Sequence, residues 1–298
     1  MQPEQISGAV IAKSRQQALC LEQRLVLDAA GIASDVTFED GWWLLIVRTE
    51  DLVPALGELS AYRRENPPRR QVAPRPVPRL GGGWLGVLGY AAVLFGVAIF
   101  AGGYTFGADW ITAGRMQASS VLDGEWWRCV TALTLHGDAG HITANLVFGA
   151  VFGGLAALAF GGGVAWLAIL LGGAIGNGLN ALIQSPDHLS LGASTAVFAA
   201  LGLLVMHAFD FREGLREGWL RRWSPFVGGV LLLAYTGTGG ERTDIMAHLT
   251  GFLAGLGLGV AAIRLPLAWL YRRSVQLGAA AAAIGLVLLA WGLALFGA

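Results

Sequence analysis

Residues 190–208 read SLGASTAVFAALGLLVMHA, a largely apolar stretch that is long enough to cross a membrane. Ser194 lies near its start, and His248 lies near the start of a second apolar run at 245–263. Polar side chains are costly at membrane depth, so we interpret both residues as functional. A serine and a histidine held together can act as a nucleophile and its general base. The pair therefore predicts a protease whose active site lies within the membrane.

The composition of the chain also indicates a membrane protein. Of its 298 residues, 55% are hydrophobic and only 13% are charged, and the mean hydropathy is +0.58. A soluble core does not need so much apolar sequence, whereas a bundle of spans of about 20 apolar residues each does. The 44 glycines suit spans whose helices approach closely. Neither a Walker-type phosphate loop nor a basic stripe for nucleic acid occurs in the sequence.

Seven apolar segments predict membrane spans. They lie near 83–101, 140–160, 163–183, 190–208, 224–238, 245–263 and 276–297. With the amino terminus inside, most arginines near the span ends fall on the inner side, and only Arg115, Arg128 and Arg242 fall on the outer side. This asymmetry predicts a cytoplasmic amino terminus and an outer carboxyl terminus. It also places Ser194 and His248 at the same, outer end of their spans, where the two side chains can meet.

Residues 1–65 predict a small soluble α+β domain with the order βαββα. We expect a strand at 9–12, a helix capped by Ser14 and ended by Gly31, a hairpin turn at Asp40-Gly41, and a last helix that begins at Thr49. The domain contains no catalytic or phosphate-binding constellation, so we interpret it as a cytosolic accessory domain. Residues 66–82 form a linker in which five prolines prevent a continuous helix and the arginines suit anionic lipid headgroups.

The outer loop at about 102–139 is too long to be a simple connector. Trp127 and Arg128 within it suit the interface between lipid headgroups and acyl chains. The loop then runs into HGDAGHITAN at 136–145, which contains His136, His141 and Asn145. His141 and Asn145 are four residues apart, so a helix places them on one face at the outer end of the second span. Both can donate hydrogen bonds to a developing oxyanion, and one such donor is commonly worth about 3 kcal/mol.

These motifs together resemble the rhomboid family of intramembrane serine proteases. The resemblance covers about 83–264 and rests on Trp127-Arg128, His136…His141…Asn145, Gly192-Ala193-Ser194 and Ala247-His248-x-x-Gly251-x-x-x-Gly255. Each motif alone is weak, but their order and their shared membrane side make the set specific. The resemblance implies an all-α polytopic membrane protein with a six-helix core at 83–264, followed by a linker and a seventh, C-terminal helix at 265–298. The preceding α+β domain is similar in element order to the cytosolic domains of some bacterial rhomboids, which implies a bacterial inner membrane.

The resemblance also assigns roles to residues. Ser194 is the expected nucleophile and His248 the expected base, with no catalytic aspartate, no metal and no other cofactor. His141 and Asn145, with the Ser194 backbone N–H, look like an oxyanion hole. Asp244 precedes His248 by four residues, as in many family members.

The implied activity is hydrolysis of transmembrane protein substrates, with membrane lipids as the surroundings and no nucleic-acid partner. We expect a cap loop near 236–244, in which Gly237, Gly239 and Gly240 permit movement, to control the entry of water from outside. One residue departs from the family pattern, because Thr195 stands where glycine is usual. Its side chain could crowd the nucleophile or narrow the backbone angles near it.

Each assignment has an alternative. Ser194 could simply cap a helix, His248 could be an interfacial histidine bonded to a neighbour, and His141 with Asn145 could merely tie the outer loop to the bundle. Trp127 and Arg128 fit loop anchors better than chemical participants. The two remaining histidines outside the motifs, His188 and His207, are interpreted as ordinary loop and span-end residues.

Two other functions compete with proteolysis. An inactive rhomboid-like protein that binds membrane clients would be recognised by loss of Ser194 or His248, and both are present. A transporter would need ionisable groups deep in several spans, whereas here the polar residues gather at one end. Neither the His-Glu-x-x-His motif of a membrane zinc protease nor a pair of intramembrane aspartates occurs. The oligomeric state is left open by the sequence.

Overall fold

The computed structural model describes residues 8–66, 83–214, 218–237 and 244–297. The chain divides into two compact units, Met1–Arg75 and Pro76–Ala298. Most of the expected linker, 67–82, lies outside the described residues, as do 238–243 of the expected cap loop.

The first unit has the expected order βαββα. Its elements are β1 (Ala9–Ser14), α1 (Gln17–Ala29), β2 (Ser34–Glu39), β3 (Trp42–Val47), a 3-10 turn (Thr49–Asp51) and α2 (Leu52–Glu65). The three strands form an antiparallel sheet with β3 in the middle. Helices α1 and α2 contribute Leu27 and Leu59 to a core that includes Leu45 of β3.

Two details of this unit show how the sequence sets its turns. Asp40 and Gly41 both have positive φ, +49° and +79°, as a tight turn between two twisted strands requires. The expectation for Ser14 was wrong, because Gln16 occupies the residue before α1. Ser14 Oγ instead accepts a hydrogen bond from the Gln16 backbone N–H at 3.0 Å, which closes a local turn just before the helix.

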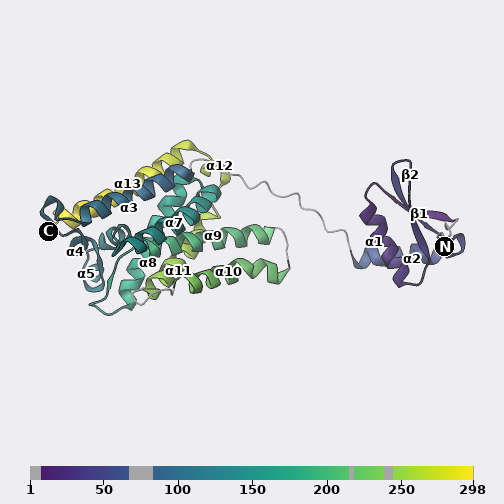
Figure 1. Ribbon diagram of the computed structural model, residues 1–298, viewed down its shortest axis with the longest axis horizontal. Coiled ribbons are helices and arrows are strands. Elements are labelled where there is room, and N and C mark those ends of the chain that lie inside the picture. Colours follow the sequence, from purple (N-terminus) through teal and green to yellow (C-terminus); the bar gives the residue numbers. More distant parts are fainter. Residues whose placement is uncertain (1–7, 67–82, 215–217, 238–243, 298) are drawn as a thin grey trace. The chain divides into compact units, whose positions relative to one another are not determined.

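The second unit is a helical bundle (Figure 1). Among the described residues, six of its helices are long and apolar enough to span a membrane, so the chain is an integral multi-pass membrane protein. They are α3 (Gly83–Ala101), α7 (Ala139–Phe160), α8 (Gly162–Ile183), α9 (Ser194–Gly214), α11 (Ile245–Ala262) and α13 (Arg273–Phe296). The expectation of an all-α polytopic protein preceded by a small sheet-containing domain is confirmed.

The predicted fifth span differs from the other six. The segment near 224–238 is helical, within α10 (Trp219–Gly237), but α10 is not among the six helices that satisfy the length and hydropathy of a span. Its first turns contain Arg221 and Arg222, and Pro225 lies inside it. These residues leave an apolar stretch that is short compared with the ~20 residues that a bilayer requires.

The outer loop between α3 and α7 is built from short elements rather than from an irregular connector. They are a 3-10 turn (Thr105–Gly107), α4 (Trp110–Gly114), β4 (Met116–Gln117), α5 (Ala118–Leu122), α6 (Arg128–Thr131) and a second 3-10 turn (Ala132–Thr134). Strand β4 pairs with β5 (Leu189–Ser190), which lies just before α9. The outer loop is therefore fixed to the segment that leads into Ser194.

Small residues let α8, α9 and α11 approach closely at the centre of the bundle. A Cβ added to Gly255 of α11 would lie 2.1 Å from the carbonyl oxygen of Ala199 on α9, and one added to Gly173 of α8 would lie 2.7 Å from the Ala196 Cβ. Real Cβ atoms do not come so near, so the α11 backbone lies directly against the α9 backbone at Gly255, and the α8 backbone lies against the small Ala196 side chain at Gly173. Because the three helices approach closely at these small residues, residues at their outer ends are held close together.

Helix α13, preceded by the short α12 (Leu267–Leu270), packs against α8 and against the outer loop. Trp291 Nε1–H donates to Thr134 Oγ1 at 3.1 Å, and its ring lies 4.5 Å from that of Trp110. At the other end of the helix, Gln276 bonds to Phe160 O and to the Val164 backbone N–H in the turn between α7 and α8. Helix α13 is thus bonded to the outer loop near its C-terminal end and to the α7–α8 turn near its N-terminal end.

Candidate functional site

Ser194 is the first residue of α9 and follows a glycine in an unusual backbone conformation. Gly192 has φ of +130°, which L side chains rarely adopt. A Cβ at Gly192 would lie 2.7 Å from His141 Nε2 and 3.7 Å from Ser194 Oγ. The absence of a side chain at Gly192 therefore opens the space in which the His141 imidazole and the Ser194 hydroxyl approach each other.

His248 lies in the first turn of α11 and is buried, with 7% of its surface exposed. Its ring lies against that of Phe198, with centroids 4.5 Å apart. Phe198 is four residues after Ser194, so both lie on the same face of α9. One turn further along, Gly251 of α11 meets the Thr195 backbone. The α9 face that begins with Ser194 is therefore the face against which His248 packs.

His141 and Asn145 lie in the first two turns of α7. Asp138 precedes the helix, and its side chain accepts the His141 backbone N–H at 2.8 Å, which fixes where α7 begins. Asn145 is 5% exposed, and its backbone oxygen accepts the Tyr90 hydroxyl at 2.9 Å. Its side-chain Nδ2 is buried and has no hydrogen-bond partner among the described residues. A buried, unused N–H donor is costly, so the site is suited to receive an acceptor from outside the chain.

His136 connects the outer loop to the residue before Ser194. Its Nε2 accepts the Ala193 backbone N–H at 3.4 Å, and its ring packs edge-on against His141 with centroids 5.0 Å apart. Burial, with the neighbouring His141 adding to it, lowers the pKa of His136 to about 4. The imidazole therefore stays neutral near pH 7 and keeps the lone pair with which it accepts the Ala193 N–H.

Asp244 is the residue before α11 and lies in a cluster of donors. Its Oδ1 accepts the Ala247 backbone N–H at 3.0 Å, and its Oδ2 accepts from Asn180 Nδ2 at 2.8 Å and from His188 Nε2 at 2.7 Å. Burial acts to raise the pKa of this carboxyl, but the hydrogen bonds, including one from Ser190, together bring it below its usual value. The carboxylate is therefore ionised at neutral pH.

His188 lies in a loop, as expected, but the sequence did not indicate that it bonds directly to Asp244. Asn180, on α8, was not considered at all, although it is fully buried and shares the same carboxylate oxygen. No local spacing in the sequence signals either contact, because the partners lie 56 and 64 residues apart. His207 remains a span-end residue, with its ring edge-on to Phe160.

Trp127 and Arg128 make their hydrogen bonds within the outer loop. Arg128 forms an ion pair with Glu125 and donates to the backbone oxygens of Thr112 and Arg115, both at 3.0 Å. Trp127 O accepts from Thr131 Oγ1 at 3.2 Å. These contacts fit the interpretation of the two residues as loop anchors.

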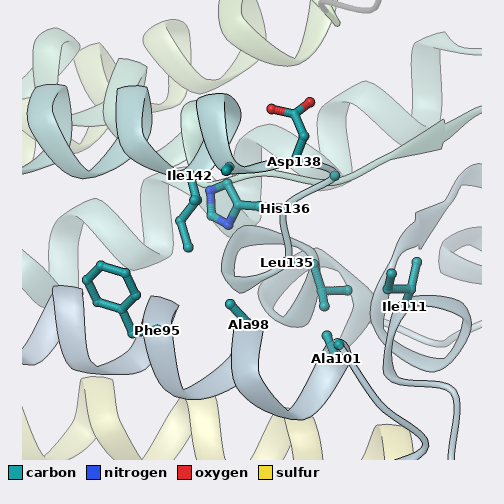
Figure 2. Close-up of a pocket in the computed structure, with 11 residues that line it drawn as sticks. Phe95, Ala98, Ala101, Ile111, Leu135, His136, Asp138 and Ile142 are labelled. Carbon is teal, nitrogen blue, oxygen red and sulfur yellow. The ribbon is translucent and has the colours of Figure 1, made fainter.

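A cavity of about 400 Å³ lies between α3 and the start of α7. Figure 2 shows His136 and Ile142 on one side of it, facing Phe95 and Ala98 of α3 on the other. Its lining is mostly apolar, and His136 separates it from the Ala193 backbone. Within the described ranges no group of three or more histidine, cysteine or acidic side chains is placed to hold a metal ion.

Comparison with known proteins identifies a Rhomboid domain over residues 123–265. Rhomboid-like protease 3 of Toxoplasma gondii is 32% identical over 145 residues, which is 49% of this chain and 55% of the relative. Rhomboid-like protein 11, chloroplastic, of Arabidopsis thaliana is 30% identical over 45% of this chain and 51% of its own. Rhomboid protease GluP of Bacillus subtilis is 28% identical over 55% of this chain and 31% of its own. The chain thus spans about half the length of the first two of these relatives and about a third of the length of the last.

Proposed function

We propose that the chain, which contains a Rhomboid domain over residues 123–265, is an intramembrane serine endopeptidase that uses Ser194 and His248 as a catalytic dyad. One observation carries the proposal. The space that Gly192 leaves is bordered by the Ser194 hydroxyl and the His141 imidazole, and the buried His248 ring packs on Phe198, one turn after Ser194 on α9. A nucleophile, a base and a donor at one point are the parts that acyl transfer needs.

The proposed reaction begins when Ser194 Oγ attacks the carbonyl carbon of the scissile peptide bond. His248 takes the hydroxyl proton as the new C–O bond forms, and later gives it to the leaving amine. Water then attacks the acyl-enzyme, with His248 again taking the proton, and releases the new carboxyl end with Ser194 restored.

The negative charge of each tetrahedral intermediate falls on the former carbonyl oxygen. We assign its stabilisation to His141, to Asn145 Nδ2 and to the Ser194 backbone N–H. The buried Nδ2 of Asn145 supports this assignment, because its hydrogen-bonding capacity is unused among the described residues. The alternative, in which His141 and Asn145 only hold the outer loop to the bundle, gives the Asn145 Nδ2–H group no function.

The proposed substrates are transmembrane proteins whose helices are locally unstable near the outer membrane face. A stable helix hides its carbonyl groups in its own hydrogen bonds, so the scissile bond must come from a segment that unwinds. The arginine asymmetry supports a cytoplasmic first unit and a Ser194 end of α9 that faces the outside. Water from that side would supply the hydrolytic step.

The test is cleavage of a transmembrane substrate by the purified protein in detergent, alongside Ser194→Ala and His248→Ala. Both variants should remain folded and lose cleavage, and a fluorophosphonate should label the wild type but not Ser194→Ala. Ser274→Ala is the matched control, since Ser274 is an exposed serine at the start of another helix, α13. A wild type that binds the substrate but neither cuts it nor reacts with the probe would favour the inactive client-binding alternative.

A further inference from the structure

The Asp244 carboxylate joins the two chain segments that lead into the proposed dyad. His188 and Ser190 lie just before Ser194, and both donate to Asp244. The Ala247 N–H, which also donates to it, belongs to the residue just before His248. The Asp244 side chain therefore accepts hydrogen bonds both from the segment that precedes Ser194 and from the segment that precedes His248.

The hydrogen bond between His188 and Asp244 is partly sheltered from solvent. The exposed fractions of the two side chains are 22% for His188 and 16% for Asp244. A hydrogen bond to an ionised carboxylate is roughly twice as strong as one between neutral groups, and it is more strongly directional when water is largely excluded. The 2.7 Å separation of Nε2 and Oδ2 lies at the short end of the range for such bonds.

The backbone around His188 is held from the opposite side. The carbonyl oxygen of His188 accepts the Ala118 N–H, and that of Pro186 accepts the Ser119 N–H, both at 3.1 Å. The outer loop therefore fixes the path of this segment through its backbone, while the His188 side chain reaches α11. Loss of the imidazole would leave the strand pairing in place but remove one of the two donors, His188 and Ser190, through which this segment holds Asp244 at the start of α11.

From this geometry we infer that His188 is a positioning residue of the proposed protease: through Asp244 it sets the start of α11, and hence His248, against the segment that carries Ser194. The inference rests on the proposed function. Among the described residues, the His188 side chain bonds to Asp244 rather than to Ser194 or His248. It acts on the reaction through the orientation of the base, as second partners of catalytic and metal-bound histidines commonly do.

The test uses the full-length protein and follows both substrate turnover and the rate of fluorophosphonate labelling. In His188→Ala we expect kcat and the labelling rate to fall together by about 10-fold or more, with KM nearly unchanged, because a misplaced base slows the attack by Ser194. His188→Gln should recover most of the rate, since its amide N–H can donate to the same carboxylate. Asp187→Asn, which removes a neighbouring exposed charge, should behave like the wild type.

A double variant separates positioning through Asp244 from any other effect. When Asp244→Asn is already present, His188→Ala should cause a clearly smaller further loss than it causes alone, because the two residues act through one contact. A His188→Ala protein that cuts and labels at the wild-type rate would overturn the inference. The inference would also be overturned if the cleavage rate of His188→Ala fell only in proportion to its melting temperature and His188→Gln did not restore it. A wild type that neither cuts nor labels would instead overturn the proposed function.

Discussion

Gly251 of α11 leaves the space that Thr195 of α9 fills. A Cβ at Gly251 would lie 2.3 Å from the Thr195 carbonyl oxygen and 2.9 Å from its Cγ2. Gly176 of α8 leaves a similar space on the other side, since a Cβ there would lie 2.8 Å from the same methyl group. The side chain that departs from the family pattern is thus accommodated by glycines on two neighbouring helices, and Thr195 is only 2% exposed.

Substitution of Gly251 or Gly255 by alanine should therefore damage both the fold and the proposed activity. The added methyl group would meet backbone oxygen and would force α11 away from α9, at a cost of about 1–3 kcal/mol or more. Gly257→Ala is the matched control on the same helix, because a Cβ there meets nothing within 4 Å. Thermal unfolding and cleavage should both separate Gly257→Ala from the other two variants; equal behaviour of all three would contradict the close contact.

Thr195→Gly tests whether the threonine obstructs the nucleophile. We expect this variant to remain active, because the Thr195 methyl group is packed between α8 and α11. It should nevertheless be less stable by about 1–3 kcal/mol, from the lost methyl packing and from glycine within a helix. Melting temperature and kcat are to be measured together. A large gain in kcat would show that Thr195 does crowd Ser194.

The proposed oxyanion donors can be separated from loop anchors by kinetics. His141→Ala and Asn145→Ala should each lower kcat by about 10²-fold, with a smaller effect on KM, because the donors act mainly on charge that develops in the transition state. Thr143→Ala is a suitable control in the same turn of α7, since Thr143 is exposed and its hydroxyl donates to Ala139 O within the helix. Losses of stability and binding without a specific loss of kcat would favour the loop-anchor alternative.

Much of this fold could be predicted from the sequence because local signals agree with it. The Asp40-Gly41 turn and the apolar run after Ser194 each specify their own element with little help from the rest of the chain. Where composition was ambiguous, prediction was weaker: the arginines and proline at the start of α10 left that helix below the hydropathy of a span.

The cluster around Asp244 could not be predicted, for a different reason. Asn180, His188 and Asp244 come from α8, from the loop before α9 and from the residue before α11. Only the close packing of the glycine-rich helices α8, α9 and α11 brings these three residues together, and no pattern along the sequence indicates this packing. Similarly, the space between Gly176 and Gly251 that accommodates Thr195 becomes visible only once the helices are packed.

The lowered pKa of His136 predicts a pH dependence of stability. The folded protein holds the imidazole neutral down to a pKa of about 4, whereas the unfolded chain takes up the proton near pH 6.5. Unfolding is therefore favoured as the pH falls from about 6.5 toward 4. The contribution of the neutral His136 to the free energy of unfolding is fully present only above this pH range, and its upper limit is about 3 kcal/mol. In detergent, the melting temperature of the wild type should fall over this range more steeply than that of His136→Gln, whose side chain can still accept the Ala193 N–H. If the melting temperatures of the two proteins changed in parallel with pH, the lowered pKa of His136 would be contradicted.

The first unit contributes no residue to the proposed site, so a chain that begins near Leu80 should still insert, fold and cut. Ser194, His141, Asn145, Asp244 and His248 all belong to the unit Pro76–Ala298. We expect at most a modest decrease in kcat in detergent, where no bilayer is present for the arginine-rich linker to bind; in anionic vesicles the difference from the full chain should be larger. The measurement is the cleavage rate of both proteins in the same micelles, with melting temperature and monodispersity as controls for folding. If the shorter chain were monodisperse and thermally stable yet inactive, the first unit would have to be part of the catalytic machinery, and the division of the chain into an accessory domain and a protease core would be wrong.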